Sequence, residues 1–156
     1  RGSVDNLVEN VDQLKKLRAY RGQKVTLAVL PFANQTQDPH NNGNAASCSE
    51  ALILPLSNIK NLSLIERMQL DKVIAEIDLS QSKYIDPAYA IELGKLINTD
   101  LVIMGALQLS GSKARILARV IETGTGSVLY TEKLEGQFDN LFDLQDKLAN
   151  SIAKAF

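Results

Sequence analysis

Three nearly continuous apolar runs, separated by stretches with helical periodicity, constrain the fold of this 156-residue chain most strongly. The runs lie at 24–32, 62–65 and 100–109. Uninterrupted apolar runs are typical of strands buried on both faces of a sheet that helices cover. Helical connections between such strands favour parallel pairing with right-handed crossovers. The first two thirds of the chain therefore predict a parallel sheet with helices packed on it.

The pattern changes after the third run, where apolar and polar residues alternate over 113–123 and 127–136. Short turn sequences at 110–113 and 123–126 separate these segments, as in β-hairpins. One predicted face consists of Ala114, Ile116, Ala118 and Val120, joined by Val128, Tyr130 and Leu134. The other, more polar face consists of Arg115, Leu117, Arg119 and Ile121. We expect an antiparallel meander with its first face under helices.

Together these segments give the element order α-β-α-β-α-α-β-β-β-α. The fold class predicted is α/β of the mixed α+β type, with a mixed sheet of about five strands packed by four to five helices. Predicted helices cover 4–20, 44–59, 68–79, 86–98 and 138–156. We expect one domain over 23–156, preceded by residues 1–22. That preceding stretch combines a tag remnant, Arg1-Gly2-Ser3, with an amphipathic helix.

The predicted N-terminal helix carries a narrow apolar stripe that includes Val4, Leu7, Val11 and Leu14. Such a stripe must be covered, either by the helix's own domain or by another subunit or domain. Both alternatives stay open from the sequence, and the stripe is a candidate interface. Because the chain has no initiator methionine, we expect it to begin inside a longer protein, with a membrane anchor upstream.

Charge and composition exclude several functions. The 17 basic and 18 acidic residues balance, which argues against a nucleic-acid partner. No apolar run approaches the ~20 residues needed to span a bilayer, so we predict no membrane-spanning segment in this chain. The single cysteine, Cys48, cannot build a cysteine metal site, and its place on a helical apolar stripe is typical of a buried residue.

The sequence also predicts that the protein is not an enzyme and has no catalytic residue, cofactor or metal. Its only histidine, His40, lies in a polar loop at 33–44 and is interpreted as solvated. No Gly-x-Ser-x-Gly elbow occurs. The Gly-Thr-Gly segment at 124–126 is predicted to be a hairpin turn. It is not a phosphate-binding loop, because such a loop is followed by a lysine and a helix, and neither follows here.

A few residues are predicted to brace corners of the fold. Glu66 and Arg67 follow the second apolar run where a helix begins, and a carboxylate at a helix start is favoured by the helix dipole. The Arg67 guanidinium offers several donors for carbonyls or a carboxylate. Gly94 lies inside the 86–98 helix, where its cost in stability predicts a close approach to a strand.

The segment "LSLIERMQLDKVIAEIDLSQSKYIDPAYAIELGKLINTDLVIMGAL" resembles the CsgG-type family of the curli secretion component. The motifs are Glu66-Arg67, the run Leu70-Asp71-Lys72-Val73 with Glu76, and Leu93-Gly94-Lys95-Leu96, followed by Asp100 and Gly105. The flanking segments resemble TolB N-terminal-type domains, and the FlgO and LpoB-type families are similar in fold. The resemblance covers residues 24–156 and implies a bracing role for Gly105 too. The hairpin 113–135 carries Arg115, Arg119, Lys133 and Glu135 on one side, which argues against its insertion into a membrane.

The resemblance implies a non-enzymatic bacterial cell-envelope domain, periplasmic or outer-membrane associated and derived from a lipoprotein. It would act in assembly or secretion, through self-association or by docking envelope proteins. Besides the N-terminal stripe, the candidate interface residues are Leu117, Ile121 and Leu129, apolar groups among charges. The alternative is a sensory or regulatory ligand-binding module of a larger signalling protein, with loop 33–44 at the ligand pocket.

Overall fold

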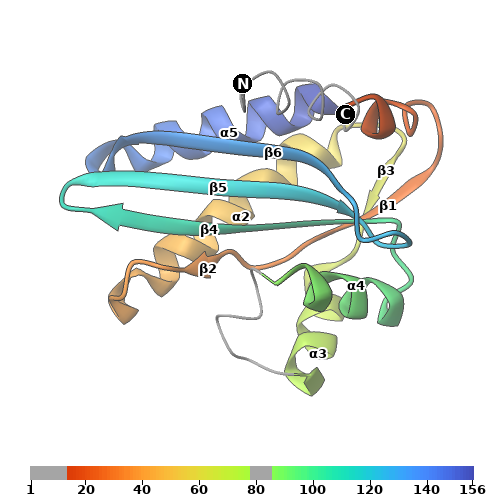
Figure 1. The fold of residues 1–156 in the computed structure, drawn as a ribbon, viewed down its shortest axis with the longest axis horizontal. Coiled ribbons are helices and arrows are strands. Elements are labelled where there is room, and N and C mark those ends of the chain that lie inside the picture. Colours follow the sequence, from red (N-terminus) through yellow and green to blue (C-terminus); the bar gives the residue numbers. More distant parts are fainter. Residues whose placement is uncertain (1–13, 78–85) are drawn as a thin grey trace, which may run out of the picture.

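The computed structural model describes residues 14–77 and 86–156 (Figure 1). Its strands are β1 (Val25–Val29), β2 (Ala33–Asn34), β3 (Leu62–Leu64), β4 (Leu101–Ser110), β5 (Lys113–Glu122) and β6 (Val128–Gln137). Its longer helices are α2 (Asn42–Ser57), α3 (Arg67–Ile77), α4 (Pro87–Leu96) and α5 (Leu141–Ala155). Two short 3-10 helices, η1 (Pro39–Asn41) and η3 (Phe138–Asn140), precede α2 and α5. This confirms the predicted mixed α/β fold class.

The described strands form one mixed sheet in the order β3-β1-β4-β5-β6, with β2 also paired to β4. β1 pairs in parallel with β3 and β4. β4, β5 and β6 run antiparallel over almost their full length. The parallel pairing predicted for the three apolar runs and the predicted antiparallel meander are both confirmed.

The strand β2, which is additional to the five strands predicted, lies within the segment that the sequence predicts as a loop. It exists because β4 has ten residues and β1 pairs only with residues 101–103 of it. After Pro31 the chain returns to the same edge of β4, where Ala33 and Asn34 pair with Ala106 and Leu107. Two residues are too few to produce a periodicity, so the sequence pattern cannot reveal this strand.

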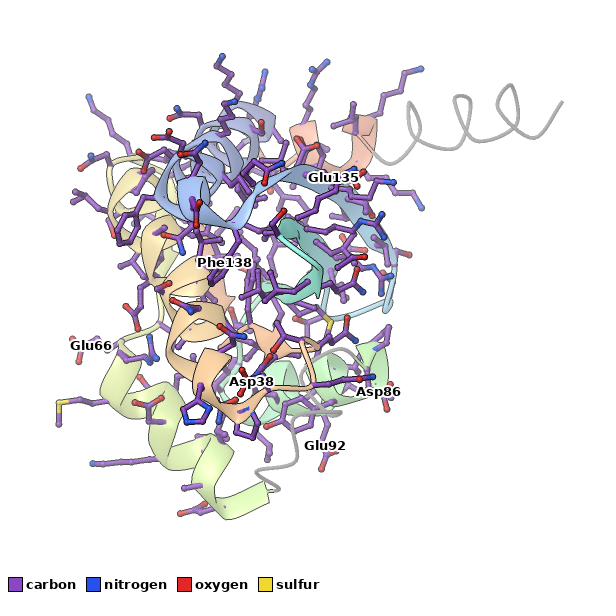
Figure 2. All side chains as sticks on the ribbon, turned by 90° about the vertical axis from the view of Figure 1, so that its left-hand side faces the viewer. Asp38, Glu66, Asp86, Glu92, Glu135 and Phe138 are labelled. Carbon is purple, nitrogen blue, oxygen red and sulfur yellow. The ribbon has the colours of Figure 1, made fainter. Side chains whose placement is uncertain are left out.

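Helices α2 and α5 cover one face of the sheet, which we call the closed face. Figure 2, which looks along the strands, shows both helices on one side of the sheet. The predicted inward residues of β5 are all buried there, at 0 or 1% exposure: Ala114, Ile116, Ala118 and Val120. Facing them are buried residues of the two helices: Ala45, Cys48, Leu52, Leu56, Leu144, Leu148 and Ile152. This layer is the main hydrophobic core.

The opposite face of the sheet is covered only in part. Helices α3 and α4 pack over its β1 and β4 strands and over the end of β5. The second core beneath them includes Ala28, Leu30, Leu70, Ile74, Ala90, Leu93, Val102 and Ile121. The start of α4 is capped, since the Asp86 side chain accepts a hydrogen bond from Ala88 N (3.0 Å) and Pro87 takes the first helical position.

The prediction that Ile121 and Leu129 lie on an exposed polar face is wrong, because both side chains are completely buried. Ile121 does lie on the second face of the sheet, as predicted, but the core under α4 covers it there. At Leu129 the cause is a register shift in β6, because Val120 pairs with Tyr130 whereas Ile121 pairs with Val128. The extra residue reverses the alternation of faces. Leu129 consequently enters the closed-face core, while Ile121 packs in the core under α4. Val128, expected on the closed face, packs against that second core instead.

The N-terminal segment docks on the domain where the structure describes it. Residues 14–18 are helical, Leu14 is partly buried, and Leu17 lies in the closed-face core at 0% exposure. The Arg21 guanidinium donates hydrogen bonds to the carbonyls of Phe156 (2.7 Å) and Lys154 (3.1 Å) at the end of α5. The stripe residues Val4, Leu7 and Val11 lie outside the described residues.

Candidate protein-interaction surface

Beyond α3 and α4, the second face of the sheet exposes side chains of β5 and β6. We call this surface the open sheet face, and it consists of Lys113, Arg115, Leu117, Arg119, Lys133 and Glu135. Five of these side chains are exposed and Leu117 is half-buried. They share one face because Arg115 pairs with Glu135 and Leu117 pairs with Lys133 across the antiparallel ladder.

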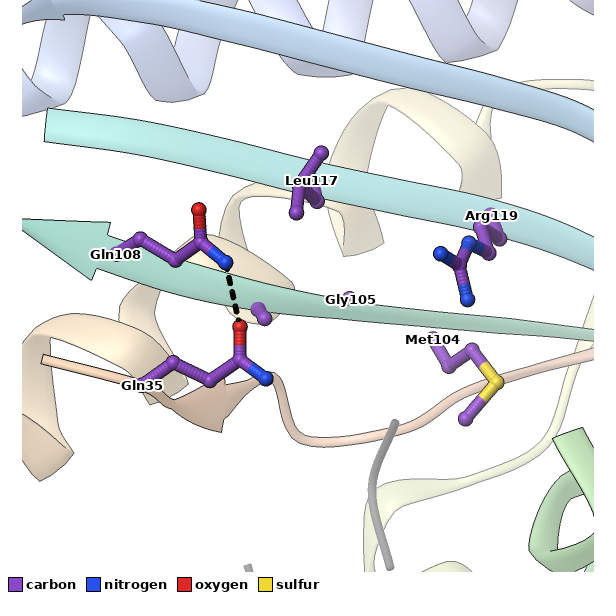
Figure 3. Close-up of a pocket in the computed structure, with 7 residues that line it drawn as sticks. Gln35, Met104, Gly105, Gln108, Leu117 and Arg119 are labelled. Atoms are coloured by element: carbon purple, nitrogen blue, oxygen red, sulfur yellow. Dashed lines mark hydrogen bonds between the residues drawn. The ribbon is translucent and has the colours of Figure 1, made fainter. Parts of the chain in front are cut away.

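A shallow pocket of about 200 Å³ lies at the border of this face (Figure 3). Met104 and Ala106 of β4 and Leu117 of β5 supply apolar walls, and the Arg119 guanidinium stands beside Met104. Two amides lie at the other end, where Gln108 Nε2 donates a hydrogen bond to Gln35 Oε1 (2.8 Å). The pocket is smaller than the roughly 300–1,000 Å³ typical of small-molecule sites, so one large side chain suits it better.

The open sheet face is positively charged, with four cations and one carboxylate. Glu135 pairs with Lys113 (3.3 Å) and Arg115 (3.2 Å). The hydrogen bonds from Arg115 and then Lys113 hold the pKa of the Glu135 carboxyl below its usual value. Arg119 and Lys133 form no ion pair with any other residue that the structure describes. Two cations beside an apolar pocket favour a partner that presents carboxylates around an apolar side chain.

A second hollow of about 380 Å³ adjoins the pocket and shares Gln35 and Gln108 with it. Its other walls come from the end of β4, the start of β5 and Glu135. This hollow is more open and more polar than the first. Together the two hollows run along the exposed side of β4 and β5.

The segment 33–44 is held in place by its own side chains. Asn34 Nδ2 donates to Asp38 O (2.8 Å) and to Asn42 Oδ1 (2.7 Å), and Asn34 Oδ1 accepts from Thr36 Oγ1 (2.6 Å). His40 Nδ1 lies 3.0 Å from Asp38 Oδ1, but its side chain is 96% exposed. The Asp38 carboxylate caps η1, because it also accepts from His40 N. The sequence interpretation of His40 as a solvated loop residue agrees with this geometry.

Arg67 stands at the corner where the sequence places a bracing pair. Its guanidinium pairs with Glu50 of α2 and, at 3.2 Å, with Asp71 one turn along α3. Arg67 thus connects two helices that cover opposite faces of the sheet. Glu66 precedes α3 with an exposed side chain (Figure 2), and its carbonyl accepts the first hydrogen bond of the helix, from Leu70 N. The bracing role remains a proposal, which this geometry supports for Arg67.

The two bracing glycines lie where the backbone leaves no room for a side chain. A Cβ on Gly94 would lie 2.5 Å from Thr123 Cγ2, just after β5, in line with the predicted close approach. A Cβ on Gly105 would lie 2.4 Å from the Leu117 carbonyl oxygen and 2.6 Å from the Phe32 ring. Real Cβ atoms do not come so close, so an added Cβ would force the Thr123 side chain to shift at Gly94 and the backbone or the Phe32 ring to shift at Gly105.

The sequence did not predict two sets of polar contacts that connect elements of the fold. Gln145, 4% exposed in the apolar stripe of α5, donates to Ser47 Oγ (2.7 Å) and to Cys48 Sγ (3.5 Å) on α2. Asp100 Oδ2 accepts from the backbone and hydroxyl of Thr26, at 3.0 and 3.1 Å, and so joins β4 to β1. A polar residue within an apolar helical stripe was the available signal for Gln145.

Burial raises the pKa of the Cys48 thiol to about 11, against a smaller lowering by the hydrogen bond from Gln145. The thiol therefore stays protonated at neutral pH, as expected for a structural cysteine. Among the described residues, no three His, Cys, Asp or Glu side chains lie close enough to hold a metal ion. Nor does any helix within 14–77 and 86–156 have the length and apolarity to cross a membrane.

The structure thus defines a class of protein: an α/β domain with one helix-covered sheet face and one face partly open to solvent. The family model for "Curli production assembly/transport component CsgG" matches residues 8–115, well over half of the chain. The chain belongs to the CsgG family, as its sequence motifs indicate.

Solved structures with the same fold include the LpoB C-terminal domain from Salmonella enterica and the lipoprotein GNA1162 from Neisseria meningitidis. The LpoB domain is 17% identical with a TM-score of 0.58, over 81% of this chain and 93% of that one. GNA1162 is 17% identical with a TM-score of 0.59, over 83% of this chain and 96% of that one. At these identities the likeness concerns the fold alone.

A curated relative, "Putative adenylate cyclase 3" of Rhizobium meliloti (strain 1021), is 25% identical over 135 residues. The match covers 85% of this chain and 21% of that protein. The chain therefore spans about a fifth of the length of this relative.

Proposed function

We propose that this chain is a non-enzymatic domain of the bacterial cell envelope that works in assembly or secretion by binding other proteins. Membership of the CsgG family supports this proposal, because that family is described as an assembly and transport component. The fold shared with a lipoprotein of Neisseria meningitidis also supports a periplasmic or outer-membrane location.

The observation that carries the proposal is the open sheet face. A sheet face normally needs a covering layer, and within residues 14–77 and 86–156 the helices α3 and α4 leave the β5 and β6 part of this face uncovered. Its combination of cations, a half-buried leucine and a small pocket is typical of a protein interface with an anchor site.

The placement of the reactive side chains supports a non-enzymatic role. The Ser47 hydroxyl donates to Asn44 O (2.8 Å) and accepts from Gln145, so it serves the packing of α2 on α5. Cys48 is buried with a raised pKa, whereas a nucleophilic cysteine needs a lowered one. His40 is exposed, and its Nδ1 lies 3.0 Å from the carboxylate of Asp38, the residue that caps η1.

Site-specific photocrosslinking in the living source organism tests the proposal. A benzoylphenylalanine at Leu117, on the open sheet face, should crosslink the full-length protein to a specific envelope protein or to a second copy. The same group at Lys60, exposed in the turn between α2 and β3, is the matched control and should give no specific product. If Leu117 yields no more product than Lys60, the open sheet face is not an interface and the proposal is wrong.

The relative named as a cyclase favours a second candidate function, a regulatory ligand-binding module within a longer signalling protein. The residues that border the two hollows, among them Gln35 from segment 33–44, would then contact the ligand. A thermal-shift screen with nucleotides and sugars separates the candidates, because a ligand that binds only the folded state raises the melting temperature. A saturable rise that Gln35→Ala and Gln108→Ala abolish would favour the regulatory module.

A further inference from the structure

We infer that the open sheet face of one copy binds the outward face of η3 and α5 on a second copy of this chain. This inference rests on the proposed function and names the partner and the two surfaces involved. It is carried by complementary charge on two surfaces of the same molecule and by one exposed aromatic side chain.

The second surface, which we call the acidic helix face, consists of Asp139, Phe142, Asp143 and Asp146. Their spacing of three and four residues places them on one side of the helix, away from the buried stripe at Leu144 and Leu148. All four are exposed. Phe142 is 77% exposed, more than any other large apolar side chain in the described residues.

The acidic helix face, with an exposed phenylalanine among three carboxylates, is complementary in charge and shape to the open sheet face, which has cations around a pocket. There, Arg119 and Lys133 lack ion-pair partners among the described residues. Arg119 lines the pocket at Leu117, and Lys133 is paired with Leu117 across the ladder. Phe142 is the right kind of anchor for a pocket of about 200 Å³, because aromatic side chains in small pockets dominate many interfaces. Asp143 and Asp146 would then meet the two cations, and the remaining charges would set the orientation.

The two surfaces cannot meet within one molecule. Helix α5 packs its buried stripe on the closed face, whereas the open sheet face is on the other side of the same strands. The contact must therefore join different copies head to tail, each copy keeping one surface free for the next. Repeated contacts of this kind form closed rings or open filaments, according to the rotation between copies.

Charge reversal with rescue tests the inference on the purified chain by sedimentation velocity. One variant carries Arg119→Glu and Lys133→Glu, and the other carries Asp143→Lys and Asp146→Lys. Each should raise the Kd for self-association by more than about tenfold, because like charges would then face each other. An equimolar mixture should associate again, since the two altered surfaces complement one another. Added salt should weaken association of the wild-type chain.

A variant with Lys60→Glu and Lys72→Glu is the control, because it makes the same net charge change as the Arg119→Glu and Lys133→Glu variant, at exposed positions outside both surfaces. It should associate like the wild-type chain, and circular dichroism should show that all variants are folded. The inference is wrong if either reversal leaves association unchanged, if the control weakens it equally, or if mixing restores nothing. A monomeric wild-type chain whose Leu117 position still crosslinks a different protein contradicts this inference but retains the proposed function. A monomer without any crosslink contradicts both.

Discussion

The two faces of β5 differ in what covers them, although they are built from alternate residues of one strand. On the closed face, Ala114, Ile116, Ala118 and Val120 lie under α2 and α5 with almost no exposed surface. On the open sheet face, Lys113, Arg115 and Arg119 are exposed, and Leu117 is half-buried. The stability of this fold therefore depends on the side chains of the closed face, whereas those of the open sheet face are free to bind other molecules.

The largest expected effect comes from the closed face. Leu148→Ala removes a side chain that is 0% exposed between α5 and the sheet. It should lower the free energy of unfolding by about 2–5 kcal/mol, through lost transfer energy and the cavity left behind. Leu117→Ala, on the open sheet face, should cost at most about 1 kcal/mol. Urea denaturation measures both, and equal losses would contradict the division between the faces.

The next largest effect is expected at Gly105, where the closed face leaves no room for a methyl group. Gly105→Ala should lower the free energy of unfolding by about 1–3 kcal/mol, because the added Cβ meets a fixed backbone carbonyl and the Phe32 ring. Gly43→Ala is the matched control, since a Cβ at Gly43 in α2 has no atom within 4 Å. The control should gain up to about 1 kcal/mol from helix propensity. A Gly105→Ala protein as stable as the control would show that the strand spacing is wrong.

Alkaline pH should weaken the docking of the N-terminal segment. Burial, and then the hydrogen bond to Glu122, raise the pKa of Tyr20 from 10.0 to about 12. Because this pKa is raised in the folded state, the contribution of Tyr20 to the stability of the fold is complete below pH 10 and is lost as the pH rises towards 12. Tyr20→Phe should therefore flatten the fall in melting temperature over this range, relative to the wild-type chain.

Tyr130→Phe removes a second tyrosine of raised pKa, which hydrogen-bonds Glu132. It should flatten the decline above pH 10 as well, because Tyr130 keeps its proton in the folded state at pH values where it ionises in the unfolded state. Identical alkaline profiles for the wild-type chain and Tyr20→Phe would show that Tyr20 does not hold the segment.

The smallest effect is expected at the Arg67 corner, which joins helices on opposite sides of the sheet. A double-mutant cycle with Arg67→Met and Glu50→Gln should give a coupling energy of about 0.2–1 kcal/mol, because both side chains are well exposed to solvent. The coupling should shrink in high salt. A coupling near zero would end the bracing proposal for this pair, and one of several kcal/mol would mean that the pair is shielded from water.

The faces of the sheet were predictable from the sequence wherever simple alternation holds. Residues 113–120 alternate without interruption, and their inward members were predicted correctly. The prediction is wrong at Leu129, because a single extra residue in β6 exchanges the faces and leaves no mark in the hydrophobic pattern. It is wrong at Ile121 because the core under α4 covers that residue, which depends on tertiary packing. The close packing at Gly94 could be predicted from a local rule, because glycine inside a helix costs stability, whereas Gly105 was marked only by the family resemblance.

The candidate surface was predictable only in outline. Leu117 was selected as an apolar residue among charges, and the structure places it on the open sheet face. The pocket beside it combines Gln35, Met104 and Arg119 from three strands or strand ends, and no sequence spacing brings these residues together. No described helix covers the open side of β5 and β6, and this depends on where α3 and α4 pack, which is likewise a property of the tertiary structure.

Thiol labelling at Leu117 tests most directly whether the open sheet face is a binding surface. In a Leu117→Cys variant the new thiol should react rapidly with a maleimide in dilute protein and become protected at concentrations where the chain associates or when its crosslinked partner is added. The native Cys48, buried with a pKa of about 11, serves as the slow internal reference in every sample. A Leu117→Cys thiol that reacts as slowly as Cys48 in dilute protein, or equally fast in every sample, would contradict the account.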